Sequence, residues 1–374
     1  MKVLFVDRKD DSYFLGFSKN LDYESYEIFL LDLKNREYTC LNTGEITKLI
    51  NHNFLIQVKG INYLLRYFAA ISFMLKFWNS KWDICHYLAI KRENIWLLPF
   101  IRKRVPKLII TIYGRSTFLN KMKRLFFRPF YKYADTITFQ NKATKKEFLS
   151  FNRRCEKFHF EEMPLPIDHF RKAHFSASIT NKANAASKLN LRNDLVRISC
   201  SSTIGLYDQH FKVIDALKKW GQSSKVQLLF LLTYGGSTAE RDKIVERIET
   251  ELSGFIYEIF TESLSNEDIL NYRHATDIYI NMRTSDQIAG SVLESLATGS
   301  FLLSAEWLNY QLLDNLDINY VKVRDFDHLV VLLDHAVETF PIFYFTHGLN
   351  NSMSILEHFA VENVIEKWMY LYKS

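Results

Sequence analysis

The chain has 374 residues, with 48 Lys and Arg against 42 Asp and Glu, and 48% of its residues are hydrophobic. This length favours two domains over one core, and the apolar content excludes a disordered chain. Four scattered cysteines without a CxxC pair are typical of reduced thiols in a cytosolic protein. The start, MKVLFVDRKDD, predicts no signal peptide, and the nine apolar residues at 67–75 are too few to cross a bilayer, which needs ~20.

The net charge of +6 is unevenly distributed along the chain. Residues 1–172 contain 31 Lys and Arg against 17 Asp and Glu, a net +14, whereas residues 173–374 contain 17 against 25, a net −8. A basic half suits an anionic surface, and an acidic half is expected to bind its ligand through a few chosen groups. The two halves are therefore predicted to meet different partners.

In the first half, strand and helix patterns alternate after an irregular segment that is expected between residue 7 and about residue 52. The strands are too continuously apolar to be half-exposed, which predicts a parallel sheet covered by helices. We expect strands at residues 2–6, 82–87, 108–113 and 136–140, and helices at about 53–78, up to 103, at 121–133 and at 143–151.

The second half repeats this alternation, so the fold class is α/β with two Rossmann-like domains. We expect strands at 196–201, 226–232, 254–260, 278–282 and 301–304, and helices at 211–220, 238–252, 266–274 and 352–372. Pro164, Pro166 and a polar Ala/Ser/Asn/Lys stretch indicate a linker. The predicted divisions are domain 1–170, linker and surface elaboration 171–193, domain 194–345, and a closing helix 346–374 that packs across both domains.

Residues 285–307, SDQIAGSVLESLATGSFLLSAEW, are the most informative stretch. Asp286 and Glu294 lie eight residues apart around a small-residue helix start, and a strand-like run follows. Both carboxylates and the backbone N–H groups of Gly290 and Ser291 would lie beside the carboxyl edge of a sheet, where open α/β folds hold phosphorylated ligands. The alternative is that Asp286 caps the helix and Glu294 is a solvated helix residue.

Two Rossmann-like halves, a proline-containing linker and a final aromatic helix resemble the GT-B glycosyltransferases. Retaining members carry Glu-x7-Glu before a small-residue helix and Gly; this chain has Asp286-x7-Glu294 and then Leu-Ala-Thr-Gly at 296–299. The resemblance implies that two parallel sheets face a cleft and that the last helix crosses back. It also implies that Glu294 holds the nucleotide ribose, that Asp286 faces the donor sugar, and that anomeric configuration is retained. A carboxylate accepting two hydroxyl hydrogen bonds suits a ribose diol.

The chain departs from that family in three ways. Its first carboxylate is Asp, and the glycine-rich loop after the first strand is missing, since only Gly16 stands there. The Arg and Lys that clamp the diphosphate are replaced by SSTIG at 201–205, which includes Thr203. We expect Arg283, His210 and Lys212 to offset phosphate charge instead. The ordinary alternatives are a surface arginine and a helix-start histidine bound to backbone.

Residues 208–217, DQHFKVIDAL, and the LTYGG turn resemble the branch that contains the lipid-linked acetamido-fucosyltransferase of bacterial surface-antigen assembly. The likeness spans about residues 196–313. In the turn, Tyr234 and Gly235 would let backbone approach a base or phosphate, although an ordinary strand-to-helix turn needs the same glycines.

In the first half, Gly114 and Arg115 end a central strand, and Arg115 is expected to contact acceptor or donor phosphate. His86 is a second cleft candidate, with a core histidine as the favoured alternative. From Lys121 to Lys132, KMKRLFFRPFYK joins cations to aromatic residues. We expect a peripheral contact with an anionic membrane that holds a lipid-diphosphate acceptor; the alternative is an amphipathic core helix with a basic outer face. No RNP, KH or zinc spacing is present, so nucleic acid is not an expected partner.

We therefore expect a cytoplasmic glycosyltransferase, peripheral on the inner face of the membrane, that moves a sugar from a nucleotide-diphosphate sugar to a cell-surface glycan or lipid-linked oligosaccharide. Lipopolysaccharide and capsule are the glycans in view. No Asp-x-Asp metal clamp stands out, so we expect neither metal nor cofactor. The alternatives are a nucleotide-sugar epimerase of the same fold and a non-catalytic scaffold subunit of a polysaccharide assembly complex. The predicted catalytic residues are Asp286, Arg283 and Arg115, and the predicted substrate-binding residues are Glu294, Gly290, Ser291, His210, Lys212, Thr203, Tyr234, Gly235 and Gly114.

Overall fold

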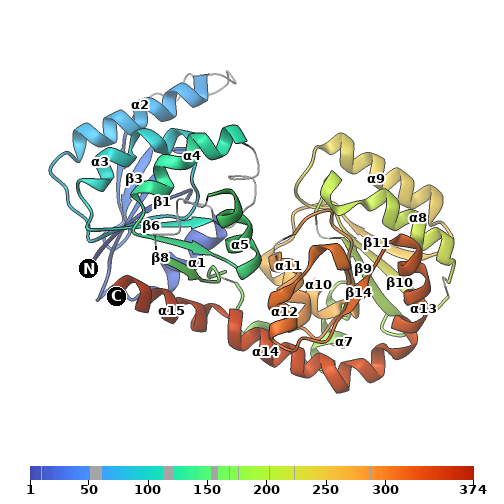
Figure 1. Ribbon diagram of the computed structural model, residues 1–374. Helices are drawn as coiled ribbons and strands as arrows, with labels where there is room; N and C mark the ends of the chain where they lie inside the picture. Colours follow the sequence, from blue (N-terminus) through green and yellow to red (C-terminus); the bar gives the residue numbers. More distant parts are fainter. Residues whose placement is uncertain are drawn as a thin grey trace. The chain divides into compact units, whose positions relative to one another are not determined.

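The computed structural model divides the chain into two compact units (Figure 1). Unit 1 comprises Met1–His169 and Val361–Ser374, and unit 2 comprises Phe170–Ala360. Each unit is a sheet with helices on both faces, so the predicted α/β class with two parallel sheets is confirmed. The structure describes residues 1–9, 11–50, 61–112, 121–152, 159–167, 169–175, 177–201, 203–222, 224–286 and 288–374.

Unit 1 contains an eight-stranded sheet in the order β4-β3-β2-β1-β5-β6-β7-β8. The pairs from β2 through β1 to β8 are parallel, and β2, β3 and β4 form an antiparallel meander at one edge. The strands are β1 (Lys2–Val6), β2 (Glu27–Asp32), β3 (Glu37–Cys40), β4 (Glu45–Lys48), β5 (Ile84–Tyr87), β6 (Lys107–Ile112), β7 (Thr136–Phe139) and β8 (His159–Glu162).

The expectation that the segment after β1 is irregular was wrong. Besides the meander, it contains helix α1 (Ser12–Asn20), whose N-cap residue Asp11 accepts a hydrogen bond from the backbone of Tyr13. Strands β3 and β4 have four residues each, mix polar with apolar side chains and carry no apolar run. Short edge strands of this kind escape a reading based on hydrophobic periodicity.

Helices cover both faces of this sheet. One core cluster joins the sheet to α2, α3, α4 and α5, and the other joins it to α1 and α15. Gly16 allows α1 to approach the chain at Pro166, because a Cβ at Gly16 would lie 2.2 Å from the carbonyl oxygen of Pro166. The helices are α2 (Ile61–Lys76), η1 (Arg92–Trp96), α3 (Leu98–Arg102), α4 (Lys121–Tyr133), α5 (Lys142–Phe151) and α15 (Val361–Lys373).

Unit 2 contains an all-parallel sheet in the order β11-β10-β9-β12-β13-β14. Its strands are β9 (Val196–Ser201), β10 (Val226–Leu231), β11 (Ile256–Phe260), β12 (Ile278–Asn281), β13 (Phe301–Ala305) and β14 (Val321–Val323). Helices α8 (His210–Trp220), α9 (Thr238–Glu251) and α13 (Phe326–Phe343) pack on one side, and α7 (Ile179–Lys188), α10 (Asn266–Ala275), α11 (Gly290–Ala297) and α14 (Leu349–Phe359) on the other (Figure 1). The shorter helical segments are α6 (Lys172–Phe175), η4 (Leu206–Asp208), η5 (Glu306–Leu308), α12 (Gln311–Asn315) and η6 (Tyr344–Gly348).

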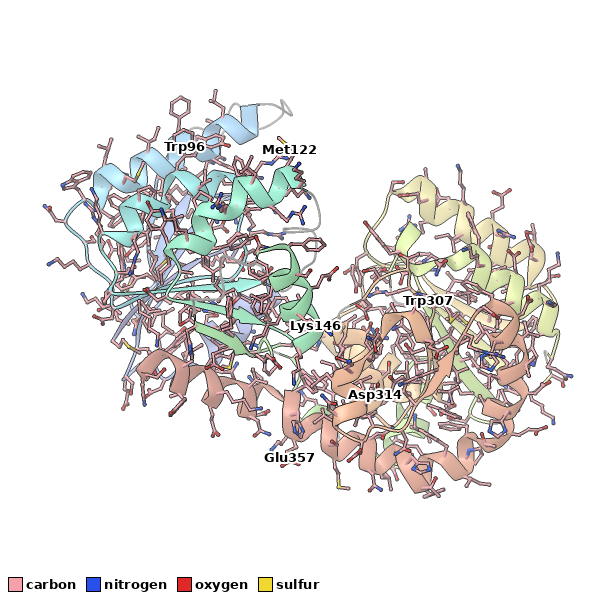
Figure 2. The ribbon with its side chains drawn as sticks, in the orientation of Figure 1. Trp96, Met122, Lys146, Trp307, Asp314 and Glu357 are labelled. Atoms are coloured by element: carbon pink, nitrogen blue, oxygen red, sulfur yellow. The ribbon has the colours of Figure 1, made fainter. Side chains whose placement is uncertain are left out.

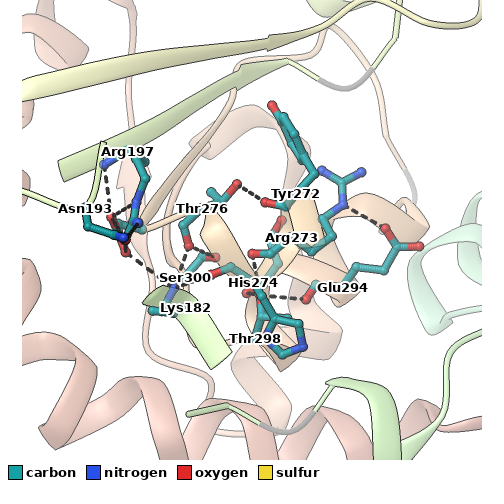
Figure 3. Close-up of polar contacts among 12 residues, drawn as sticks. Lys182, Asn193, Arg197, Tyr272, Arg273, His274, Thr276, Glu294, Thr298 and Ser300 are labelled. Carbon is teal, nitrogen blue, oxygen red and sulfur yellow. Dashed lines mark hydrogen bonds and ion pairs between the residues drawn. The ribbon is translucent and has the colours of Figure 1, made fainter. Parts of the chain in front are cut away.

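The segment expected to be a surface elaboration contains α7, which packs against α10. Lys182 of α7 is buried, and its Nζ donates to the carbonyl oxygen of Thr276 at 2.6 Å (Figure 3). The same ammonium lies 3.6 Å from Asp277, and burial lowers the pKa of Lys182 to about 8. Lys182, Ala185 and other small or polar residues of this segment thus pack in the core of unit 2. The polar composition of the segment had predicted a surface position instead.

One helical stretch among the described residues, Phe326–Lys373, is apolar and long enough to cross a bilayer by length and composition alone. Its most apolar window has a mean hydropathy of 1.3 and is 39% buried. Leu329 and Leu333 are buried in unit 2, whereas Val364 and Trp368 are buried in the core of unit 1. The single closing helix expected from the sequence is two helices, α14 and α15, which meet at Ala360.

Candidate functional site

Predicted site residues gather at the carboxyl edge of the sheet of unit 2. Thr203 follows β9, Tyr234 follows β10 and Arg283 follows β12. Because these strands are parallel, the segments that follow them meet at one edge, where open α/β sheets bind ligands.

Arg283 lies at the centre of a polar network. Its Nε donates to Oδ1 of Asp208 at 2.8 Å, its Nη2 donates to the hydroxyl of Thr203 at 3.3 Å, and its Nη1 lies 3.6 Å from Oδ1 of Asp286. Burial lowers the pKa of Arg283, but Tyr279 and the two carboxylates outweigh this and raise it. The guanidinium is therefore a permanent cation held between two carboxylates, and it is not a surface arginine.

Asp286 ties the loop before α11 to the segment after β13. Its Oδ2 accepts the backbone N–H of Ala289 at 3.0 Å and also accepts the hydroxyl of Tyr310. Ile288, which lies between Asp286 and Ala289 in the sequence, has a φ of +66°, an unusual conformation for a β-branched residue. The N-cap residue of α11 is Ala289, without a side-chain cap, so the alternative that Asp286 caps the helix is wrong. Asp286 is a turn-forming acceptor three residues earlier, and it stabilises a strained loop before the helix N-terminus.

Glu294 is buried on α11, so the alternative of a solvated helix residue is wrong. Its Oε2 accepts from Nε of Arg273, in α10, at 2.8 Å (Figure 3). Nη1 of Arg273 is also buried and has no hydrogen-bond partner among the residues that the structure describes. Burial disfavours the charge of Arg273, but Glu294 and nearby tyrosines overcome this and raise its pKa. A buried N–H group without an acceptor is costly, which makes this position a candidate ligand contact.

The sequence analysis missed Arg273 because nothing in its local pattern marks it. The residue stands in the last turn of a helix, where an arginine is ordinarily a solvated partner of the C-terminal carbonyl groups. A helical side chain leans toward the N-terminus of its helix. Here the side chain reaches Glu294 on the neighbouring helix α11.

Gly290 and Ser291 form the first turn of α11, where backbone N–H groups have no intrahelical acceptor. The hydroxyl of Ser291 accepts a hydrogen bond from Tyr279 of β12 at 3.1 Å. The guanidinium of Arg273 lies 5.9 Å from the centre of the Tyr279 ring, so Tyr279 is close both to the start of α11 and to the buried pair. Positive charge near the start of α11 thus comes from the helix dipole and from two arginines, Arg273 and Arg283.

His210 and Lys212 differ in their surroundings. His210 is buried at the start of α8, and its Nε2 lies 2.7 Å from the carbonyl oxygen of Thr203. Burial lowers the pKa of His210, so the ring is neutral and donates from Nε2 to that carbonyl. This is the backbone-bound histidine of the alternative interpretation. Lys212 is exposed, and its Nζ donates to the side chain of Gln209 at 3.0 Å.

A pocket of about 450 Å³ opens between the first turns of α8 and α9. Its size lies within the ~300–1,000 Å³ range of small-molecule sites. Phe211 and Ile244 give it apolar surface, and Lys212 and Lys243 place two ammonium groups on its wall beside the single carboxylate of Glu240. The pocket therefore suits a ligand with an apolar or ring portion and negative charge.

Tyr234 and Gly235 form the turn after β10. Gly235 has a φ of +97°, and a Cβ there would lie 2.3 Å from the carbonyl oxygen of Ile204. Ile204 and this turn exchange backbone hydrogen bonds of 2.7 Å, so chain packing alone requires the glycine. The ordinary-turn alternative therefore accounts for Gly235, while Tyr234 is 58% exposed at the edge of the sheet.

His86 is a core residue, as its favoured alternative expected. Nδ1 and Nε2 lie 2.7 Å from the hydroxyls of Tyr372 and Thr111, respectively. Gly114 and Arg115 lie outside the described residues, and their roles stay predictions. Among the residues that the structure describes, no group of three or more His, Cys, Asp or Glu side chains is arranged to hold a metal ion.

No protein-family model matches this chain, and a search of curated proteins finds no match. Solved structures are similar over the whole chain. A glycosyltransferase from Rickettsia africae has a TM-score of 0.72 at 14% identity, with 100% of this chain and 97% of that chain covered. Sucrose-phosphate synthase from Thermosynechococcus elongatus has a TM-score of 0.74 at 14% identity, covering 100% and 98%. Anabaena HepE in complex with UDP-glucose has a TM-score of 0.74 at 12% identity, covering 100% and 99%.

The chain has the GT-B fold. Within this GT-B chain the structure brings Thr203, His210, Arg283 and Asp286 into one polar network. Glu294 lies on the neighbouring helix with a basic partner that the sequence did not reveal.

Proposed function

We propose that the chain is a glycosyltransferase that takes its sugar from a nucleotide-diphosphate sugar bound to unit 2. The observation that carries this proposal is the buried pair of Arg273 and Glu294, with an unpartnered guanidinium N–H, beside the first turn of α11. It is supported by the GT-B fold shared with HepE, whose structure holds UDP-glucose.

In this proposal Glu294 binds the ribose hydroxyls, and Arg273 both orients that carboxylate and donates to the nucleotide. The first N–H groups of α11, at Gly290 and Ser291, meet the diphosphate, as anions bind at helix N-termini. Asp286 acts on the donor sugar side chiefly by holding Arg283 in place. Preorganised donors of this kind stabilise charge on a leaving diphosphate.

The wall of the 450 Å³ pocket supports the same assignment. Arg283 is already balanced by Asp208 and Asp286, so further positive charge must offset a diphosphate. Lys212 and Lys243 provide it from two different helices. We propose that they replace the Arg and Lys clamp missing after β9.

The finer chemistry rests on the resemblance of the Asp286-x7-Glu294 spacing to retaining enzymes. We propose retention at the anomeric carbon, no metal and no further cofactor. The anomeric coupling constant of the product, by NMR, separates retention from inversion. Full transfer in excess chelator is the expected result, and abolition of transfer would contradict metal independence.

We further propose that unit 1 contacts an anionic membrane that carries the acceptor, a lipid-linked oligosaccharide or other cell-surface glycan. On α2, Leu64, Phe68, Ile71 and Leu75 are each 46–72% exposed. Their spacing of four, three and four residues places them on one helix face. Among the described residues nothing covers this apolar stripe, which the sequence pattern did not reveal.

The stripe on α2 is accompanied by exposed apolar and basic residues. Trp96 of η1 packs edge-on against Tyr67 of α2, with ring centres 6.4 Å apart. Trp96 and Met122, both largely exposed, lie on the side of unit 1 formed by α2, α3 and α4 (Figure 2). Helix α4 adds lysines and arginines from Lys121 to Lys132, while its Phe127 and Phe130 are buried. Apolar side chains ringed by cations fit the headgroup region of an anionic, cytoplasmic-face leaflet.

The decisive experiment is calorimetric titration of the full chain with UDP and a panel of other nucleoside diphosphates, followed by transfer assays with the matching sugar nucleotides. We expect one nucleotide to bind and Glu294→Gln to weaken it about tenfold or more, as loss of a hydrogen bond to a charged group predicts. Product without an acceptor would indicate the epimerase. Absence of binding by every nucleotide would overturn the proposal and favour a scaffold subunit.

A further inference from the structure

A second pocket lies in unit 1, at the carboxyl ends of β1 and β2. Strand β1 pairs with β2 on one side and with β5 on the other, so the strand order reverses at β1. Ligands of open α/β sheets bind at such switch points. The pocket has a volume of about 240 Å³, and its walls carry charged side chains from four segments of the chain.

Asp7, the first residue after β1, has one carboxylate oxygen in this pocket without a hydrogen-bond partner among the described residues. Its side chain is 1% exposed, and its Oδ1 accepts from Nζ of Lys91 at 3.2 Å. Its Oδ2 is buried and has no hydrogen-bond partner in the part of the chain that the structure describes. Burial raises the pKa of Asp7 to about 6 in spite of Lys91, so the carboxyl is mostly ionised at neutral pH. A buried carboxylate oxygen without a donor costs folding free energy.

The neighbouring carboxylates have their donors. Asp32 accepts the backbone N–H groups of Lys9 and Lys34 at 2.9 Å each, and therefore shapes the loop around the pocket. Glu93 accepts from Nη1 of Arg66 at 2.8 Å. Of these three carboxylates, only Asp7 has a buried oxygen without a donor among the described residues, and that oxygen needs a hydrogen-bond donor.

The charge of the walls selects the kind of donor. Four cations (Arg8, Lys34, Arg66 and Lys91) and three anions line the pocket, a net +1, which disfavours a second ammonium as the ligand. A hydroxyl on a neutral or acidic molecule can donate a hydrogen bond to Asp7 without adding a positive charge to the pocket. The volume lies below the ~300 Å³ at which small-molecule sites usually begin, which leaves room for one small ring.

We infer that this pocket binds a single sugar ring through a hydroxyl that donates to Oδ2 of Asp7. The volume of the pocket, its net charge and the unpaired oxygen of Asp7 together indicate a carbohydrate. That the ring belongs to the acceptor of a sugar transfer rests on the function proposed above.

The test is saturation-transfer NMR of the full chain with methyl glycosides of glucose, galactose, mannose, N-acetylglucosamine and glucuronate. We expect at least one to receive saturation from the protein. In Asp7→Asn the Lys91 ammonium holds the amide oxygen, so an N–H would face the ligand hydroxyl. The affinity should fall about tenfold or more, the effect of losing one hydrogen bond to a charged group. Glu45→Gln, which removes an exposed carboxylate of β4, is the matched control and should leave the signal unchanged.

UDP titration of the same variants separates this inference from the proposed function. Asp7→Asn should bind UDP as the parent chain does, which also shows that the variant is folded, and Glu294→Gln should keep the glycoside signal. If no glycoside binds the parent chain, or if the signal survives in Asp7→Asn, the pocket is not a sugar site. If the signal depends on Asp7 but no nucleotide binds, the inference stands and the proposed transfer fails.

Discussion

Nε of Arg273 donates to Oε2 of Glu294 at 2.8 Å, which joins the helix before β12 to the helix after it. Both side chains are almost completely buried, at 4% and 8% exposure. A buried ion pair is favourable only when its remaining hydrogen-bonding groups are also satisfied, yet Nη1 of Arg273 has no hydrogen-bond partner in the described part of the chain. The pair is therefore better explained by binding than by stability.

Removing one member of this pair should destabilise the chain far more than removing both. Arg273→Met leaves the Glu294 charge buried alone, a loss of ~3–5 kcal/mol in the free energy of unfolding. The double variant Arg273→Met/Glu294→Leu replaces both charges with apolar groups and should recover most of that loss, while nucleotide binding stays abolished. Chemical denaturation and UDP titration measure the two effects. A double variant as unstable as the single one would contradict a binding role for the pair.

Five of the six strands described in unit 2 were predictable because buried parallel strands are apolar runs, and these five begin and end within two residues of their expected bounds. The three-residue strand β14 was not predicted, nor was β2 in unit 1, although β2 is buried and parallel to β1. The positions of Asp286 and Glu294 beside a helix start follow from that same alternation. Local sequence could not reveal Arg273, because its partner lies 21 residues away and only the packing of α10 on α11 brings them together. Lys182 was missed for a similar reason, since its acceptor is a backbone carbonyl 94 residues further on.

Tyr310→Phe should impair transfer without unfolding the chain. The Tyr310 hydroxyl donates to Asp286 and accepts from Nδ2 of Asn281 at 2.7 Å. Burial and the charge of Asp286 hold the pKa of Tyr310 well above its usual range, so the hydroxyl keeps the proton that it donates. Its loss removes one hydrogen bond to a charged group, ~1.5–3 kcal/mol, and loosens the contact of Asp286 with Arg283. We expect kcat/KM to fall roughly 10- to 100-fold.

The matched control is Tyr320→Phe. Tyr320 makes the same kind of hydrogen bond, 2.9 Å to Asp314, in the same unit but away from Arg283. It should alter the melting temperature slightly and leave kcat/KM unchanged. Equal kinetic losses in the two variants would assign the effect to general loosening of unit 2.

Asp7→Asn should stabilise the chain at neutral pH and have little effect at pH 4. Burial raises the pKa of Asp7 to about 6, above its ordinary value near 3.8, so the folded state resists ionisation. The stability that Asp7 contributes is therefore complete below its ordinary pKa and is lost as pH rises through about 6. Two pKa units correspond to ~3 kcal/mol in the free energy of unfolding. The net gain is smaller, because Lys91 loses its ionic partner in the variant. Denaturant unfolding at several pH values measures this; a difference between variant and parent that does not change with pH would contradict it.

His86 should set part of the acid stability of unit 1. Burial lowers its pKa to about 3, below the ordinary value of 6.5, so the unfolded chain binds this proton first. The corresponding stability is complete above about 6.5 and is lost as pH falls toward 3. His86→Gln should flatten the fall in unfolding free energy over that range, by roughly 5 kcal/mol at most. The exposed His335→Gln on α13 serves as the control and should leave the fall unchanged.

Neutralising the basic side chains of α4 should release the chain from anionic vesicles. Each Lys or Arg near such a surface contributes ~1 kcal/mol, so replacing four of them should weaken binding by two to three orders of magnitude, roughly. Binding to phosphatidylglycerol vesicles in sedimentation assays should also fall with salt, because the Debye length shortens to ~8 Å at physiological ionic strength. The four replacements are Lys121→Gln, Lys123→Gln, Arg124→Gln and Arg128→Gln.

The apolar stripe of α2 provides the second half of that prediction. Phe68→Ser with Leu75→Ser removes exposed apolar surface and no charge. Binding that persists at high salt should therefore disappear in this variant, while the salt-dependent part remains. Neutralising the same number of lysines outside α4, at Lys48, Lys142, Lys145 and Lys146, is the control for total charge. If this control releases the chain as fully as the α4 variant does, the attraction is a property of net charge, and no docking face exists on α2 and α4.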